Sequence, residues 1–157
     1  MTEMKKSVKI IIALLLLPLI LDISIMLAND IIANKPEKEL LNFTLPERTQ
    51  LVESNSVAGK LYGNGNGMQY IGQLLVVSEL SAEALYAHYS EIDEWIVVIR
   101  QESPVIYEYF PKQEFKNFDS TKNNYIIELV RSNPETLNSY SFENFFWKLL
   151  DWDIRGH

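Results

Sequence analysis

The stretch from residue 59 to 73, GKLYGNGNGMQYIGQ, contains the residue pattern most suggestive of chemistry, because glycine-rich loops can hold phosphate groups. A phosphate loop leads into the N-terminus of a helix, whose free amides bind the anion. Here the residues after Gly67 alternate as a strand, and the G-x-G-x-G spacing fits neither nucleotide-binding motif. We therefore interpret the stretch as a hairpin turn, with the side-chain amides of Asn64 and Asn66 as candidate partner contacts at its tip.

A second candidate for chemistry is the acidic group Glu91, Asp93 and Glu94, since two carboxylates can act as general acid and base and three can hold a cation. We interpret this group as a solvated turn, because the sequence indicates no cleft around it. His88 has no partner Ser, Cys or acid placed by the sequence, and we expect it at the edge of the core or in solvent. The chain has no cysteine, and its other histidine is the terminal His157. The sequence thus provides no catalytic residue, no metal site and no cofactor motif.

The charge balance narrows the classes of partner. The chain carries a net charge of -7 over 157 residues, and from residue 34 onward it has eleven basic and eighteen acidic residues. Such a surface repels the phosphate backbone, so we expect no nucleic-acid partner. With 47% apolar residues, the chain is long enough to bury one ordinary core.

The first thirty residues have the composition of a membrane segment. Twelve apolar residues run from Ile10 to Leu21 behind a short leader with three lysines, and the apolar character continues to Ala28. Residues 8–28 therefore predict a membrane span, and Asp22 is expected near its outer interface. The alternative is a signal peptide that is removed, after which the domain is secreted; the lack of an A-x-A cleavage triplet favours the uncleaved anchor.

The lysines predict the orientation and the organisation of the rest of the chain. Because they precede the span, the positive-inside rule places the N-terminus in the cytoplasm and the domain outside. Two prolines and mixed charges follow the span, and they predict a tether. The expected organisation is an anchor over residues 1–33, a tether over 34–44 and an extracytoplasmic domain over 45–157.

The remaining pattern predicts an α+β domain in two layers. Strands are expected at 51–62, 68–77, 95–100, 105–110 and 124–131, with one helix at 78–92 that begins at the N-cap Ser81. We expect 68–77 to be central and 95–100 to be buried. The order predicts an antiparallel or mixed sheet of about five strands with one packed helix, a variant of the ferredoxin-like topology.

The C-terminal residues 141–154, SFENFFWKLLDWDI, predict an unusually aromatic helix. Its first interpretation is a cover for the second face of the sheet. The alternative is an exposed contact with a partner protein or the outer leaflet, in which Phe145, Trp147 and Trp152 are the candidate contacts. Asp151 and Asp153 argue against anionic lipid.

The stretch from Ser56 to Leu80, continued into LSAEALYAHY, resembles a group of small, membrane-anchored, uncharacterised proteins of Gram-positive bacteria of the Bacillota type. The resemblance covers about 35 residues. It implies placement outside the cytoplasm and a strand, turn, strand, helix core, and it supplies no catalytic residue.

These observations favour a membrane-anchored, extracytoplasmic binding domain without catalytic activity, whose partner is a protein or an envelope component. One alternative is an immunity-type protein that protects its host from a bacteriocin or membrane-active toxin. Another is an envelope-polymer hydrolase that uses surface carboxylates such as Glu91 and Asp93. The oligomeric state and the ligand do not follow from the sequence.

Overall fold

The computed structural model describes residues 2–59, 67–107, 113–132, 146, 148–151 and 153, with side chains from residue 8 onward except those of Tyr107 and Gln113. The candidate contacts Asn64, Asn66, Phe145, Trp147 and Trp152 lie outside these residues. The elements are α1 (Thr2–Asn42), β1 (Thr49–Gly59), β2 (Gln69–Ser78), α2 (Ala82–Tyr89), β3 (Ile96–Gln101), β4 (Val105–Tyr107), β5 (Gln113–Glu114) and β6 (Asn124–Ser132).

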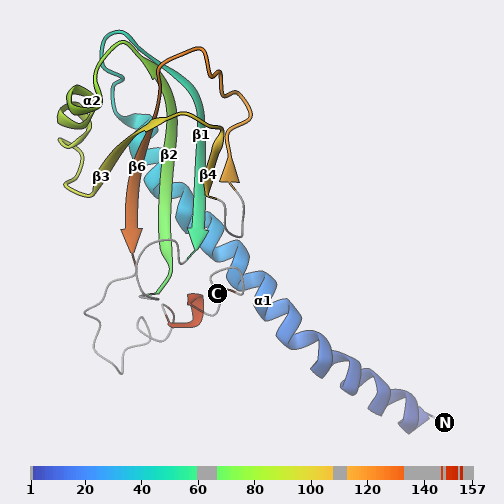
Figure 1. Ribbon diagram of the computed structural model, residues 1–157. Helices are drawn as coiled ribbons and strands as arrows, with labels where there is room; N and C mark the ends of the chain where they lie inside the picture. The colour runs from blue at the N-terminus through green and yellow to red at the C-terminus, as the bar shows by residue number, and fades with distance from the viewer. Residues whose placement is uncertain are drawn as a thin grey trace.

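Helix α1 has two parts with different surroundings. Its N-terminal part projects away from the rest of the chain (Figure 1), and its apolar side chains are exposed. It contains an 18-residue window of mean hydropathy 2.9, so by length and composition it is able to cross a membrane. Its C-terminal part lies on the sheet, where a seam of residues about one turn apart is buried: Ile25, Asn29, Ala33, Pro36 and Leu40.

The prediction of a tether over residues 34–44 is wrong, because α1 continues through Pro36 to Asn42. A proline inside a helix removes one backbone hydrogen bond and favours a break. Here the buried contacts of Ala33 and Leu40 with the domain outweigh that preference. Helix α1 is therefore also a layer of the domain, and its exposed apolar part continues into that layer without an interruption of the helix.

The main sheet has four strands in the order β1-β2-β6-β3, and all neighbouring strands are antiparallel. Strands β1 and β2 form the predicted hairpin, and β2 is central as expected. Strands β2 and β3 are parallel, and β6 lies between them, so β2, α2 and β3 form a split βαβ unit. The described residues contain one such unit rather than two, so the α+β class is confirmed and the ferredoxin-like variant is not.

The two faces of the sheet have separate cores. The helix face, which α1 and α2 cover, buries Leu74 and Val76 of β2 with Ile127 and Leu129 of β6. The hairpin face, named for the two-stranded sheet of β4 and β5, buries Leu75, Phe115 and Ile126. Helix α2 begins as predicted, because the Ser81 hydroxyl accepts a hydrogen bond from the Ala84 amide at 3.3 Å.

Two further predictions differ from the structure. Strand β3 is an edge strand in which only Ile96 is buried, so the prediction of a buried strand at 95–100 is wrong. An unbroken apolar run does not distinguish an edge strand from a central one. Of the helix predicted at 141–154, the structure describes Phe146 and Lys148 to Leu150 as helical, and this leaves the full aromatic helix unconfirmed.

Candidate functional site

The outer edge of β3 carries apolar side chains that are open to solvent. Val97 and Ile99 are each 40% exposed, and Trp95, just before the strand, is 66% exposed. Val97 and Ile99 lie opposite Glu128 and Ile126 of β6, which places them on the hairpin face. We call Trp95, Val97 and Ile99 the β3 edge surface. No described strand pairs with this edge, since β3 is terminal in the sheet.

A cavity of about 670 Å³ adjoins this surface. The start of β3 and the end of β6, which pair at one end of the two strands, form it together with the turn that precedes β3. It is large enough for several side chains of a peptide. Its lining includes Trp95, Ile96, Val97, Val130 and Arg131.

Arg131 fixes the turn at the wall of this cavity. Its guanidinium donates to the Asp93 carboxylate at 2.6 Å and to the Glu39 carboxylate of α1 at 2.7 Å. Asp93 also accepts a hydrogen bond from the Trp95 amide at 2.8 Å. The Trp95 amide first, and the Arg131 guanidinium after it, lower the pKa of the Asp93 carboxyl below its ordinary value. This ion-paired carboxylate positions Trp95 and is a poor general acid at neutral pH.

The charges around the β3 edge surface are mainly acidic. Glu91 and Glu94 are exposed in the turn before the strand, and Glu102 is exposed just after it. Arg100 is the exposed cation of the strand itself. Arg131 neutralises part of the charge of Asp93 and Glu39, so Glu91 and Glu94 leave an excess of acid at the start of β3. At the end of the strand, the charges of Arg100 and Glu102 balance.

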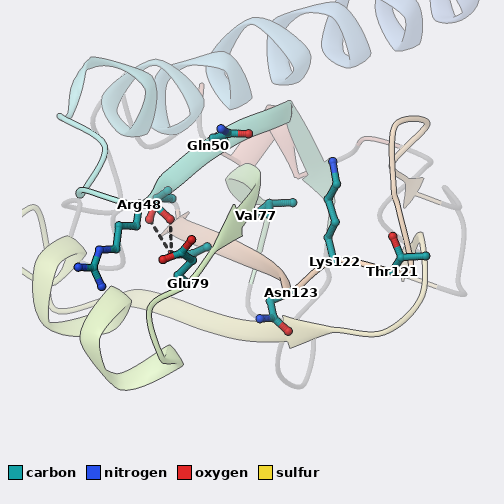
Figure 2. A pocket seen from close by; sticks show the side chains of 9 residues that line it. Arg48, Gln50, Val77, Glu79, Thr121, Lys122 and Asn123 are labelled. Carbon is teal, nitrogen blue, oxygen red and sulfur yellow. Dashed lines mark hydrogen bonds between the residues drawn. The ribbon is translucent and has the colours of Figure 1, made fainter.

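A second cavity, of about 510 Å³, lies at the end of the sheet where β1 begins and β2 ends. Arg48, Glu79 and Lys122 line it with the polar residues of neighbouring turns (Figure 2). Arg48 has a positive φ of 60°, and its carbonyl oxygen accepts a hydrogen bond from the Glu79 amide at 3.2 Å. Figure 2 shows the Arg48 side chain pointing away from Lys122, so the two cations do not converge on one anion.

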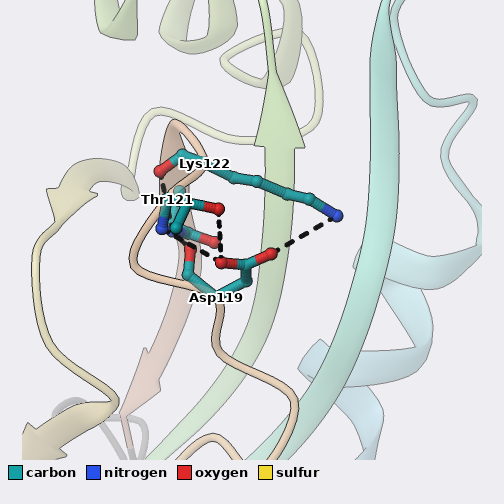
Figure 3. A network of polar contacts seen from close by, with 4 residues as sticks. Asp119, Thr121 and Lys122 are labelled. Carbon is teal, nitrogen blue, oxygen red and sulfur yellow. Dashed lines mark hydrogen bonds and ion pairs between the residues drawn. The ribbon is translucent and has the colours of Figure 1, made fainter.

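The turn before β6 explains why Lys122 is held apart. The Asp119 carboxylate accepts hydrogen bonds from the Thr121 amide at 3.0 Å and the Thr121 hydroxyl at 2.7 Å, and its other oxygen lies 3.7 Å from the Lys122 ammonium (Figure 3). The two bonds from Thr121, before the contribution of Lys122, lower the pKa of Asp119. These contacts close a turn, and this end of the sheet is accordingly a less favourable binding site than the β3 edge surface.

Two buried polar clusters were missed by sequence reasoning. On the hairpin face, the Gln73 amide donates to the Glu128 carboxylate at 2.5 Å, and both side chains are fully buried. The signal was a polar residue in the apolar interior of each of two strands, Gln73 in β2 and Glu128 in β6. The other cluster centres on Asn29 of α1, which accepts a hydrogen bond from the Tyr70 hydroxyl at 2.9 Å and donates to the Asp153 carboxylate at 2.9 Å.

The residues that the sequence analysis singled out do not meet at one site. The His88 ring bonds the Thr44 carbonyl oxygen at 2.7 Å and contacts Phe43 at 5.0 Å between ring centroids, as expected for the edge of the core. Within the described ranges, no three His, Asp or Glu side chains are close enough to hold a metal ion. Asp93 is engaged by Arg131 and Trp95, whereas Glu91 and Glu94 are exposed.

Comparisons with known proteins identified no relatives: no protein-family model, no curated protein and no solved structure matches the chain.

Proposed function

We propose that this chain is a membrane-anchored binding protein whose domain lies outside the cytoplasm and binds an extended segment of a partner protein along the β3 edge surface. The observation that carries the proposal is the open edge of β3, with Val97 and Ile99 each 40% exposed beside a cavity. The partner segment adds a strand next to β3, and alternate side chains of that segment contact the exposed apolar residues.

The anchoring rests on α1. Its exposed apolar part is long enough to cross a membrane, and three lysines precede or begin it, which favours a cytoplasmic N-terminus. Removal of the first 28 residues as a signal peptide would take Ile25 out of the buried seam, where it is 3% exposed. The packing of α1 therefore supports an anchor that stays on the chain.

The chemistry of the partner follows from the surroundings of β3. An edge strand presents unpaired backbone amides and carbonyls, which another extended chain can satisfy. Val97 and Ile99 on its hairpin face are apolar, and the exposed charges at its start, Glu91 and Glu94, are acidic. We therefore propose a partner segment with alternating apolar residues and basic residues at the end that lies beside the start of β3, since opposite charges favour association.

A second copy of this chain is a less favourable occupant when both copies share a membrane. Antiparallel pairing of two β3 strands requires a two-fold axis perpendicular to the sheet. Helix α1 lies along the sheet (Figure 1), so this axis would point the two N-terminal segments in opposite directions. Two copies with their anchors in one bilayer cannot meet in that way.

The orientation is tested by labelling introduced cysteines, because the chain has none of its own. Glu83→Cys places a thiol on the exposed face of α2. In intact cells, a membrane-impermeant maleimide should label this variant as completely as it does after lysis. Labelling that requires lysis would contradict the extracytoplasmic placement.

The binding site is tested by photo-crosslinking in cells. A photoreactive phenylalanine analogue at Val97 or Ile99 should give adducts with one partner protein. The matched control is Leu51 on β1, which is also 40% exposed and also lies on an edge strand. In addition, Ile99→Lys should abolish the Val97 adduct, because a cation replaces an apolar contact. Equal adducts from Leu51, or none from Val97 and Ile99, would exclude the β3 edge surface as the site.

A further inference from the structure

The exposed part of α1 is short for a bilayer. From Val8 to Ser24 the helix is exposed apart from the half-buried Asp22, and Ile25 is the first fully buried residue. Seventeen residues at ~1.5 Å each span about 26 Å, against about 30 Å for the hydrocarbon core. Any tilt of the helix reduces this length further. Where the bilayer keeps its ordinary thickness, part of the domain therefore lies at the depth of the membrane boundary.

The part of the domain beside this end of α1 is the C-terminal segment, of which residues 146, 148–151 and 153 are described. Asn29 of α1, one turn after Ile25 on the same face, donates to the Leu150 carbonyl oxygen at 3.0 Å and to the Asp153 carboxylate at 2.9 Å. These bonds fix the C-terminal segment beside the first buried turn of α1. The described helical turn of this segment lies next to α1 in Figure 1.

The two acids of this segment do not oppose contact with lipid, because both are directed into the domain. Asp153 is 1% exposed and bonded to Asn29. Asp151 is half-buried and accepts a hydrogen bond from the Met68 amide at 2.8 Å. What remains exposed among the described residues of the segment is Phe146, at 40%, and Lys148. An exposed aromatic ring and an exposed lysine are both residue types that occur at the interface between headgroups and acyl chains.

We propose that the C-terminal segment is an interfacial membrane contact that lies among the lipid headgroups and upper acyl chains, beside the outer end of the span. The proposal rests on the membrane anchoring of the proposed function. It assigns a partner, the lipid surface, to the exposed side chains of Phe146 and Lys148. The sequence agrees, because this region is rich in Phe and Trp, which concentrate at membrane interfaces.

The test uses single spin labels on the full chain reconstituted in phosphatidylcholine vesicles. Cysteines replace Phe146, Lys148, Glu83 or Leu16 one at a time, and collisions of each label with oxygen and with a water-soluble nickel chelate are measured. Labels at Phe146 and Lys148 should collide with the nickel chelate several-fold less often than the label at Glu83, and with oxygen more often. Burial against protein would instead lower collisions with both reagents.

The outcomes separate this inference from the proposed anchoring. The interfacial contact would be overturned if the labels at Phe146 and Lys148 were as accessible to nickel as the label at Glu83, or shielded from both reagents. In either case, a Leu16 label embedded in lipid would still support the proposed membrane anchor. A Leu16 label in water would overturn the anchor and the interfacial contact together.

Discussion

Gly72 is the residue on which the close approach of α1 to the sheet depends. A Cβ atom at this position would lie 2.2 Å from the Glu37 nitrogen and 2.4 Å from the Pro36 carbonyl carbon. These are backbone atoms, so a side-chain rotation cannot relieve the clash. The sequence places Gly72 in a strand, but the reason for a glycine there lies in a helix 35 residues earlier.

We predict that Gly72→Ala destabilises the chain by about 3 kcal/mol, at the upper end of the usual cost of overpacking. Urea denaturation of the full chain in mild detergent measures the change. Leu51→Ala, at an exposed position of β1, is the control and should cost less than about 1 kcal/mol. Equal stability of the Gly72→Ala and Leu51→Ala variants would mean that α1 does not approach β2 this closely.

Two buried tyrosines provide a second comparison between single residues. The Tyr70 hydroxyl bonds Asn29, whereas the Tyr89 hydroxyl has no hydrogen-bond partner among the described residues. Tyr70→Phe leaves the buried Asn29 oxygen unsatisfied and should cost about 1 to 3 kcal/mol at pH 7. Tyr89→Phe removes a hydroxyl that gains nothing from burial, so the free energy of unfolding at pH 7 should stay the same or rise slightly. Urea denaturation at pH 7 compares the two variants.

The same tyrosines make the fold sensitive to alkali. Burial raises the pKa of Tyr89 from 10.0 to about 12, and burial together with Asp151 and Asp153 raises the pKa of Tyr70. The unfolded chain therefore loses these protons near pH 10 while the folded chain keeps them, and the free energy of unfolding falls as the pH rises from 10 toward 12. Tyr89→Phe should flatten this loss. Denaturation midpoints measured at pH 8 and pH 11 give the two slopes, and identical slopes would contradict the raised pKa of Tyr89.

At the scale of elements, substitutions in the second half of α1 test whether this segment is a tether or a structural layer of the domain. Leu40 is 1% exposed in the main core cluster, and its neighbour Leu41 is 42% exposed. Leu40→Ala should cost about 2 to 5 kcal/mol, because it removes buried atoms and leaves a cavity. Leu41→Ala should cost less than about 1 kcal/mol. Thermal denaturation of both variants measures the difference, and a Leu40 variant as stable as the Leu41 variant would restore the tether.

The elements also show how far the sequence alone could predict the fold. Local signals were sufficient for β1, β2 and β6 and for α2, whose Ser81 cap and apolar spacing are contained in a few residues. They failed for residues 34–42, because two prolines and mixed charges indicate a loop unless the sheet beneath the helix is known. They also failed for β3, since its place at the edge depends on β6, which enters the sheet later in the chain. For the same reason, the candidate site on β3 was not predicted, and only its flanking acids were noticed.

At the scale of the whole molecule, the proposed anchoring through the continuous helix α1 would set how the domain faces the membrane. Asn29 of α1 is hydrogen-bonded to Tyr70 on the sheet and to Leu150 and Asp153 of the C-terminal segment, so these three parts are held together. A domain on a flexible tether could turn its binding surface in any direction. A domain joined to its anchor by a continuous helix would present the β3 edge surface at a fixed height and angle, which suits the proposed binding of a partner segment.

This rigidity gives a prediction about self-association that only the whole molecule can test. Centred on Val97, an antiparallel pair of β3 strands would place Val97 opposite its own copy, Ile96 opposite Val98, and Trp95 near Ile99. The strand thus favours pairing with itself by composition, while the direction of α1 opposes such pairing in one bilayer.

Val97→Cys would bring two thiols within disulfide reach in such a pair. In detergent, where each anchor is free, oxidation should yield a disulfide dimer of this variant. After reconstitution into vesicles at a low ratio of protein to lipid, the same oxidation should leave the chain monomeric on a non-reducing gel. Leu51→Cys, on the opposite edge of the sheet, serves as the control for random collision in both conditions. A Val97→Cys dimer that forms in vesicles above the Leu51→Cys level would contradict the geometry in which α1 lies along the sheet and crosses the membrane, because the two anchors would then share one bilayer.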